Sequence, residues 1–212
     1  MKIEIRSPSQ AKVGASTFLL IPAAGDSYLN KLGLLSEQFN FLELDYDLRD
    51  PSQVLDYALK TIELLEEKKI KSLSLIGWQE GGALAQAISV RTWRILRRLV
   101  LLDSFTRLSP TWFEQLVDRI ESYLPLGLPL RNTTNAYDSR PELHRIHCPT
   151  LVLRSLDSDM HLDFQAQLLN KYIPNSWLKK LTEPAMASNQ LSQELSKLIS
   201  DFEQVPAKRS QK

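Results

Sequence analysis

The chain has 212 residues, of which 43% are hydrophobic and 24% charged, a composition typical of one soluble globular domain and not of a disordered segment. Lys and Arg number 26 and Asp and Glu number 25, so the net charge of +1 disfavours general nucleic-acid binding, which relies on a basic excess. The single cysteine, Cys148, excludes an internal disulfide framework and a cysteine-rich zinc site.

Apolar runs of strand length alternate with segments of helical spacing along the chain. In chain order, the pattern predicts a strand at 17–21, a helix at 28–39, a strand at 41–44, a helix at about 53–68, a strand at 73–76, a helix at 83–90 and a strand at 99–102. An amphipathic stretch at 112–123 follows within an irregular region. The pattern then predicts a strand at 150–153, a helix at 163–172, a strand at 177–181 and a last helix near 190–204.

This alternation predicts the α/β class, with a mainly parallel sheet, right-handed crossovers and helices on both faces. Sites in such sheets lie beyond the carboxyl ends of the strands. We therefore expect the functional residues in the turns that follow Ile21, Ile76, Leu102, Leu153 and Leu181.

The turn after Ile76 reads Gly-Trp-Gln-Glu-Gly-Gly and holds three of the chain's seven glycines. It follows a predicted strand and opens a predicted helix, which is the pattern of the nucleophile elbow, G-x-S-x-G. On this motif the chain resembles the α/β-hydrolase superfamily. The resemblance extends from about Thr17 to Phe202 and includes the segments FLLIPAAGDS, LDYDLRD, LRRLVLLDS, HRIHCPTLVLRSLDSD and IPNSWLKKL. It implies a single domain over 1–204, a short helical cap at about 104–147 and a flexible tail at 205–212.

The catalytic residues of that superfamily are not retained at the positions that the resemblance assigns. The nucleophile position is Gln79, whose neutral carboxamide is a poor nucleophile, and the histidine position is Met186. The acid position is Ser158, with Asp157 and Asp159 one step away, and no histidine follows His161. Without two of the three triad members, we expect ordinary ester or amide hydrolysis to be negligible.

Two backbone N–H groups are expected at the former oxyanion site, those of Ala23 and Glu80. Gln79 either binds a polar ligand through its amide or simply fills the old site, and Trp78 either lines a pocket or packs against neighbouring strands. The candidate residues of a ligand pocket are Ala23, Ala24, Trp78, Gln79, Glu80 and Met186.

The remaining candidates have plainer interpretations. His144 and His147 are expected at the surface, and Cys148 as an inert small hydrophobe. His161 is expected at the carboxyl edge of the sheet, where the functional residues should lie, but not as a base for the residue at position 79. A basic cluster with Trp93 either binds an anion or is a solvated helix end; its arginines are Arg91, Arg94, Arg97 and Arg98.

The amphipathic stretch at 112–123, which contains Trp112, Phe113 and Leu116, is either core or an exposed patch for a partner. Three functions stay open: a pseudo-hydrolase that acts by ligand binding or protein interaction, an enzyme with atypical chemistry on a small acyl or ester substrate, and a pure scaffold. We expect no cofactor, metal or nucleic acid. Since no apolar run has the length of a signal-peptide core or a membrane span, a cytoplasmic location is expected.

Overall fold

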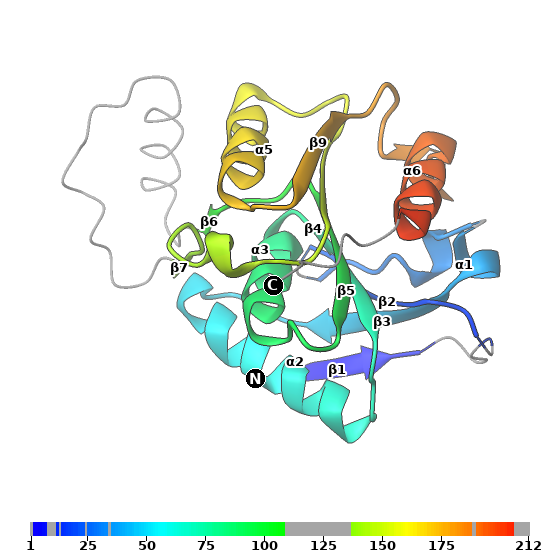
Figure 1. Ribbon diagram of the computed structural model, residues 1–212, viewed down its shortest axis with the longest axis vertical. Helices are drawn as coiled ribbons and strands as arrows, with labels where there is room; N and C mark the ends of the chain where they lie inside the picture. The colour runs from blue at the N-terminus through cyan, green and yellow to red at the C-terminus, as the bar shows by residue number, and fades with distance from the viewer. Residues whose placement is uncertain are drawn as a thin grey trace.

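A seven-stranded sheet forms the centre of the molecule in the computed structural model (Figure 1). The structure describes residues 2–7, 12, 14–23, 25–33, 35–108, 137–187 and 190–205. The strands run in the spatial order β1-β3-β2-β4-β5-β8-β9. Their bounds are β1 Ile3–Arg6, β2 Thr17–Ile21, β3 Asn40–Tyr46, β4 Leu73–Trp78, β5 Leu96–Leu102, β8 Thr150–Arg154 and β9 Ser176–Lys180.

All neighbouring strands in this sheet are parallel except β1, which pairs antiparallel to β3 at one edge. The inner strands β2, β4 and β5 are almost continuously buried, as parallel strands covered on both faces must be. The predicted mainly parallel α/β sheet is confirmed.

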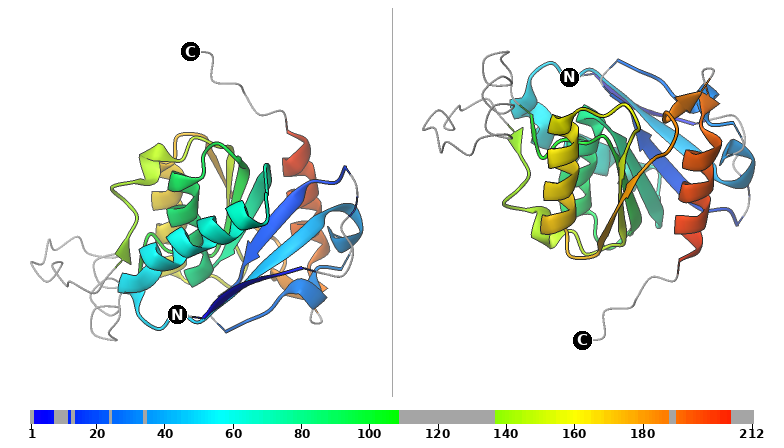
Figure 2. Two further views of the ribbon diagram at one scale, coloured as in Figure 1. Left: turned by 90° about the horizontal axis from the view of Figure 1, so that it is seen from below. Right: turned by 90° about the horizontal axis from the view of Figure 1, so that it is seen from above.

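Helices cover both faces of the sheet (Figure 2). Within the described residues, the α-helices are α1 Leu35–Gln38, α2 Val54–Glu67, α3 Glu80–Arg91, α5 Met160–Tyr172 and α6 Gln193–Gln204. Buried residues of α2, α3 and α5 belong to one apolar core cluster, and those of α1 and α6 belong to a second one. Successive residues of β4 face these two clusters alternately, so that Leu75 contributes to the first and Ile76 to the second.

Several predicted elements differ from the structure at their ends. The predicted helix at 28–39 is divided into a 3-10 turn, η1 Leu29–Lys31, and the short α1, because Gly33 between them has a φ of 50°. The N-terminal strand β1 was not predicted, since only Ile5 of its four residues is buried. The start of the predicted last helix is instead a hairpin of β10 Met186–Ala187 and β11 Gln190–Leu191.

A small antiparallel pair, β6 Arg107–Leu108 and β7 Tyr137–Asp138, lies where the predicted cap segment leaves and rejoins the domain. The other short elements are the 3-10 turns η2 Pro51–Gln53 and η4 Leu143–Arg145. The amphipathic stretch with Trp112, Phe113 and Leu116, and the tail at 206–212, lie outside the described residues. Of the helices that are described, none has the length and apolarity needed to cross a bilayer.

Candidate functional site

The turn between β4 and α3 holds its central residue in an unusual backbone conformation. Gln79 has a φ of 51° and a ψ of −120°, a region that residues other than glycine rarely adopt. Its N–H donates to Leu102 O at 3.0 Å, and its own carbonyl accepts from Gly82 N at 3.0 Å. The side chain is half-buried and has no hydrogen-bond partner among the described residues. The sharp turn therefore presents an unpaired carboxamide beyond the carboxyl end of β4.

The glycines around Gln79 are required by close contacts. A Cβ on Gly81 would lie 2.2 Å from Ile21 O and 2.2 Å from Pro22 O. A Cβ on Gly82 would lie 1.7 Å from Ser104 Oγ, and one on Gly77 would lie 2.6 Å from Gly82 Cα. The spacing of glycines in the sequence thus reflects the tight approach of α3 to the ends of β2 and β5.

The end of β2 lies directly against the first turn of α3. Ala23 is buried, and its carbonyl accepts from Asp26 N at 3.0 Å. Pro22 O accepts from the Tyr46 hydroxyl at 2.7 Å. Glu80 is half-buried in the first turn of α3, where a carboxylate complements the helix dipole. Among the pocket candidates, Ala24 lies outside the described residues.

Two tyrosines beside this turn stay neutral over the ordinary pH range. Burial raises the pKa of Tyr46 far above its usual value, and the negative charge of Glu80 adds to this effect. Burial also raises the pKa of Tyr28, with further contributions from a hydrogen bond to Asp26 and from nearby carboxylates. Both tyrosines therefore act as hydrogen-bond donors and not as bases.

A buried carboxylate at this edge of the sheet belongs to Asp103, at the end of β5. Asp103 is 6% exposed and has a φ of 47°. Its Oδ1 accepts from Ser155 N at 2.9 Å and from Ser158 Oγ at 2.5 Å. The sequence pattern predicts only that a strand ends before Asp103, and a lone acidic side chain before Ser104 does not indicate these contacts.

The two aspartates predicted near the acid position have other surroundings. Asp159 caps α5, because its Oδ1 accepts from Leu162 N at 2.9 Å. Asp157 is exposed in the turn before it. The structure thus brings Ser158, and neither neighbouring aspartate, into hydrogen-bonding contact with Asp103.

Met186 lies in the β10–β11 hairpin that precedes α6 and is partly buried against the second core cluster. Trp78 belongs to the same cluster, is 8% exposed and stacks on Tyr28 with ring centroids 4.7 Å apart. The cavity lined by Trp78 has a volume of only about 10 Å³ and an apolar lining, so it is no larger than about one water molecule. In the described part of the structure, Trp78 is therefore a packed core residue.

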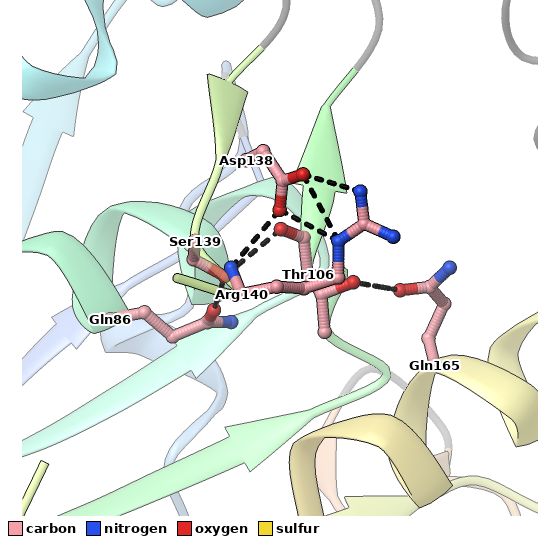
Figure 3. A network of polar contacts seen from close by, with 6 residues as sticks. All are labelled: Gln86, Thr106, Asp138, Ser139, Arg140 and Gln165. Carbon is pink, nitrogen blue, oxygen red and sulfur yellow. Dashed lines mark hydrogen bonds and ion pairs between the residues drawn. The ribbon is translucent and has the colours of Figure 1, made fainter. Parts of the chain in front are cut away.

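A buried polar network holds the root of the predicted cap between α3 and α5 (Figure 3). Ser139 Oγ donates to Gln86 Oε1 at 2.6 Å, and Gln86 Nε2 donates to Phe105 O at 2.9 Å. The N–H and hydroxyl of Thr106 donate to Gln165 Oε1 at 3.0 and 2.7 Å. The network fixes both chain ends that lead into residues 109–136.

An ion pair beside this network also stabilises the root. Arg140 Nε donates to Asp138 Oδ1 at 2.8 Å, and its Nη2 contacts Oδ2 (Figure 3). Burial by itself would raise the pKa of Asp138, but the hydrogen bonds and charge of Arg140 outweigh it and leave the pKa below its usual value.

The histidines and the cysteine belong to other elements than the turn at Gln79. His144 is in η4, and His147 precedes β8 at its amino end. His161, in the first turn of α5, has its Nε2 3.3 Å from Gln165 Nε2. Burial raises the pKa of the Cys148 thiol to about 12, which makes it unreactive. The described residues contain no group of three or more histidines, cysteines or carboxylates suited to a metal ion.

The predicted basic cluster is not one solvated surface. Arg91 pairs with Glu142, and Arg94 lies over the Trp93 ring. Arg98 is on β5 and only 5% exposed, with its Nε 3.1 Å from Glu203 Oε2. The expectation of a solvated helix end is wrong for Arg98, because β5 begins at Leu96 and turns this residue into the protein.

Comparison with known structures gives many matches over nearly the whole chain. They include the enol-lactonase from Burkholderia xenovorans LB400, with a TM-score of 0.71, 17% identity, and 94% of this chain and 95% of that chain covered. MGS-M2, an α/β-hydrolase enzyme from a Medee basin deep-sea metagenome library, matches with a TM-score of 0.70 and 14% identity, covering 94% and 93%. MenH from S. aureus matches with a TM-score of 0.66 and 17% identity, covering 94% and 97%.

No protein-family description and no curated protein sequence matches this chain. These three structural matches, each below 20% identity, establish the α/β-hydrolase fold. They do not by themselves transfer an activity to this chain.

Proposed function

We propose that this protein is a non-catalytic α/β-hydrolase-fold protein that acts by binding a small molecule or a protein partner at the carboxyl edge of its sheet. The observation that carries the proposal is Gln79: the strained backbone of a nucleophile turn is kept, but the side chain on it is a carboxamide. A side chain held in that conformation at a cost of about 1–3 kcal/mol is typical of a functional position.

The chemistry of the neighbouring residues supports a non-catalytic role. Gln79 has no ionisable proton that a base could remove near neutral pH. The chain's three histidines all precede the position of Met186, which lies instead in an apolar environment. An activated nucleophile therefore cannot be assembled from the residues at the triad positions.

The same residues are suited to recognition. The Gln79 carboxamide both donates and accepts hydrogen bonds, and it is not paired with any described residue. The half-buried Glu80 lies next to it and supplies a carboxylate. We propose Ala23, Ala24, Gln79, Glu80 and Met186 as the surroundings of the ligand, and Trp78 as packed support for the turn.

A second candidate function is an enzyme with atypical chemistry on a small acyl or ester substrate. It is favoured by the buried Asp103 carboxylate at the same edge of the sheet and by the activities named for the structural neighbours, such as the enol-lactonase. In that case Glu80 and Gln79, with Asp157 or Asp159, assist proton transfer. Against it, the carboxylate of Asp159 already caps a helix, and that of Asp103 already accepts two hydrogen bonds within the protein.

The protein-partner form of the proposal uses the predicted cap. The sequence places Trp112, Phe113 and Leu116 on one apolar stripe, which is the surface we propose for a partner. A cytoplasmic location likewise stays a prediction from the sequence.

Native mass spectrometry of the purified full chain, compared with the denatured sample, tests the proposal. We expect an added mass that disappears on denaturation and is lost in a Gln79→Ala variant of unchanged stability. A parallel assay with p-nitrophenyl esters and simple lactones should show no turnover above the buffer rate. Turnover that Gln79→Ala or Glu80→Gln abolishes would overturn the non-catalytic proposal in favour of the enzyme.

A further inference from the structure

A second concave surface lies at the amino edge of the sheet, opposite to the end of β4 that carries Gln79. It encloses about 520 Å³, within the range typical of small-molecule sites. Three segments form it: the turn and start of β5, the residues that lead into β8, and the end of α6. Its lining includes Trp93, Leu96, Arg97, Arg98, Pro149, Glu203 and Val205.

Arg98 is the central charged group of this groove. Its Nε pairs with Glu203 Oε2 at 3.1 Å, and its Nη2 donates to Glu203 O at 2.8 Å and to Val205 O at 2.5 Å. These bonds satisfy the last carbonyls of α6. Among the described residues, the remaining nitrogen, Nη1, is buried without a hydrogen-bond partner, and so is the acceptor Glu203 Oε1 of the same groove. A buried donor of a charged group without an acceptor is costly, and this is a specific reason to expect an oxygen ligand beside it.

The charge balance of the groove favours an anion. Arg97 Nη2 lies 3.5 Å from Glu203 Oε1, so one carboxylate faces the guanidinium groups of both Arg97 and Arg98. Two cations against one anion leave one positive charge uncompensated. Arg97 is half exposed and is therefore free to reach a bound molecule. A monoanion with two oxygens matches both this charge and the planar guanidinium fork.

The rest of the lining is suited to an apolar body. The Trp93 ring is 64% exposed, and Leu96, Pro149 and Val205 lie in the same groove. We propose that this groove is a second binding site, distinct from the one at Gln79, for a small carboxylate with an aromatic or aliphatic body. The carboxylate would bind at Arg97 and Arg98, and the body would lie against Trp93.

A ¹⁹F NMR titration of the full chain with 4-fluorobenzoate, and with neutral 4-fluorobenzamide of the same shape, tests the site. We expect saturable binding of the acid and at least about tenfold weaker binding of the amide. The indole N–H resonance of Trp93, assigned through its loss in Trp93→Phe, should shift with the same saturation curve. Equal binding of acid and amide, no saturable binding of the acid, or a shift of the Trp78 indole in place of Trp93 would each overturn the proposal.

Variants separate the site from a general charge effect. Arg97→Gln and Arg98→Lys should each weaken 4-fluorobenzoate binding about tenfold, because the first removes a cation and the second keeps the charge but loses the free Nη1. Arg98→Lys keeps a cation beside Glu203, so the fold is maintained, which thermal unfolding verifies. The matched control is Arg49→Gln, an exposed cation paired only with Asp47, which should bind as the parent does. Unchanged binding in both groove variants would refute the site.

Discussion

Ser158 Oγ donates a 2.5 Å hydrogen bond to Asp103 Oδ1, joining the loop after β8 to the end of β5. The resemblance to α/β-hydrolases places the catalytic acid at Ser158. In this chain that position offers a hydroxyl to a carboxylate on the neighbouring strand. Ser155 N donates to the same oxygen, so this carboxylate holds the loop after β8 against the end of β5.

Restoring the nucleophile alone should not restore hydrolysis. Gln79→Ser places a hydroxyl on the strained turn, but no histidine lies at the position of Met186 to accept its proton. We expect the rate of p-nitrophenyl acetate and butyrate hydrolysis by Gln79→Ser to equal that of Gln79→Ala. A rate for the serine variant that clearly exceeds the alanine control and saturates with substrate would show that another residue acts as the base.

The conformation of Gln79 leads to a stability prediction. Its φ of 51° with a ψ of −120° costs a side-chain-bearing residue about 1–3 kcal/mol, whereas glycine adopts it without that strain. After the greater entropy loss of glycine on folding is deducted, Gln79→Gly should stabilise the protein by about 1 kcal/mol.

Chemical denaturation of both proteins measures this difference. The matched control is Gln53→Gly, because Gln53 has an ordinary φ of −84° and ψ of −1° at the start of α2. That substitution should destabilise the protein by up to about 1 kcal/mol. If Gln79→Gly is as destabilising as Gln53→Gly, then the turn is not strained and the main observation behind the proposed function is lost.

The main strands of the sheet could be predicted because the pattern that defines a buried parallel strand lies within a few consecutive residues. Runs such as 17–21 and 150–153 are almost wholly apolar, and this pattern is enough to define buried parallel strands. The glycines at 77, 81 and 82 likewise predicted a turn whose tight contacts the structure shows.

The parts that the sequence did not predict depend on contacts between distant segments. Asp103 and Ser158 are 55 positions apart, and no local pattern pairs them. Arg98 looks like one of four solvated arginines until Glu203, 105 positions later, is brought beside it by α6. The strand β1 carries a single buried residue, so its pairing with β3, not its composition, makes it a strand.

Gly82 and Ser104 should show strongly coupled substitutions. A Cβ on Gly82 would meet Ser104 Oγ at 1.7 Å and Ser104 Cβ at 2.5 Å, so Gly82→Ala forces either α3 or the loop after β5 to move. We expect Gly82→Ala to cost about 3 kcal/mol or more, and Ser104→Gly in the same protein to recover at least about 1 kcal/mol of it.

A double-mutant cycle measured by urea unfolding gives the coupling energy. The Ser104→Gly variant alone supplies the reference for its own loss of a side chain. Strict additivity of the two changes would mean that the close approach of α3 to Ser104 does not exist in solution.

The buried side-chain amide of Gln165 should contribute more to the stability of the protein than an exposed glutamine in the same helix. Gln165→Leu removes the acceptor of both Thr106 donors and leaves the buried Thr106 N–H unpaired. We expect a loss of about 1–3 kcal/mol of stability. Gln167→Leu is the matched control, because Gln167 is exposed in the same helix and should change stability by less than about 0.5 kcal/mol. Equal effects in a thermal melt would contradict the role of the network in holding the cap root.

The ion pair of Asp138 with Arg140 predicts a dependence of stability on pH. Because the pKa of Asp138 is lower in the folded than in the unfolded protein, its carboxylate stabilises the fold fully above the unfolded value of about 3.9. This contribution is lost as the pH falls from about 5 through that value toward the lower folded pKa. The pair is about one-third exposed, so screening limits the contribution to about 1 kcal/mol or less at pH 7.

The comparison of the parent with Asp138→Asn from pH 7 to pH 3 isolates this contribution. The parent should be more stable at pH 7, and the two unfolding free energies should converge as the pH approaches 3, because the protonated aspartic acid and asparagine then pair equally poorly with Arg140. Asp157→Asn controls for the loss of one exposed charge. Convergence of the same size in that control would assign the effect to net charge. A difference for Asp138→Asn that does not change with pH would show that the Asp138 carboxylate has the same pKa in the folded and the unfolded protein.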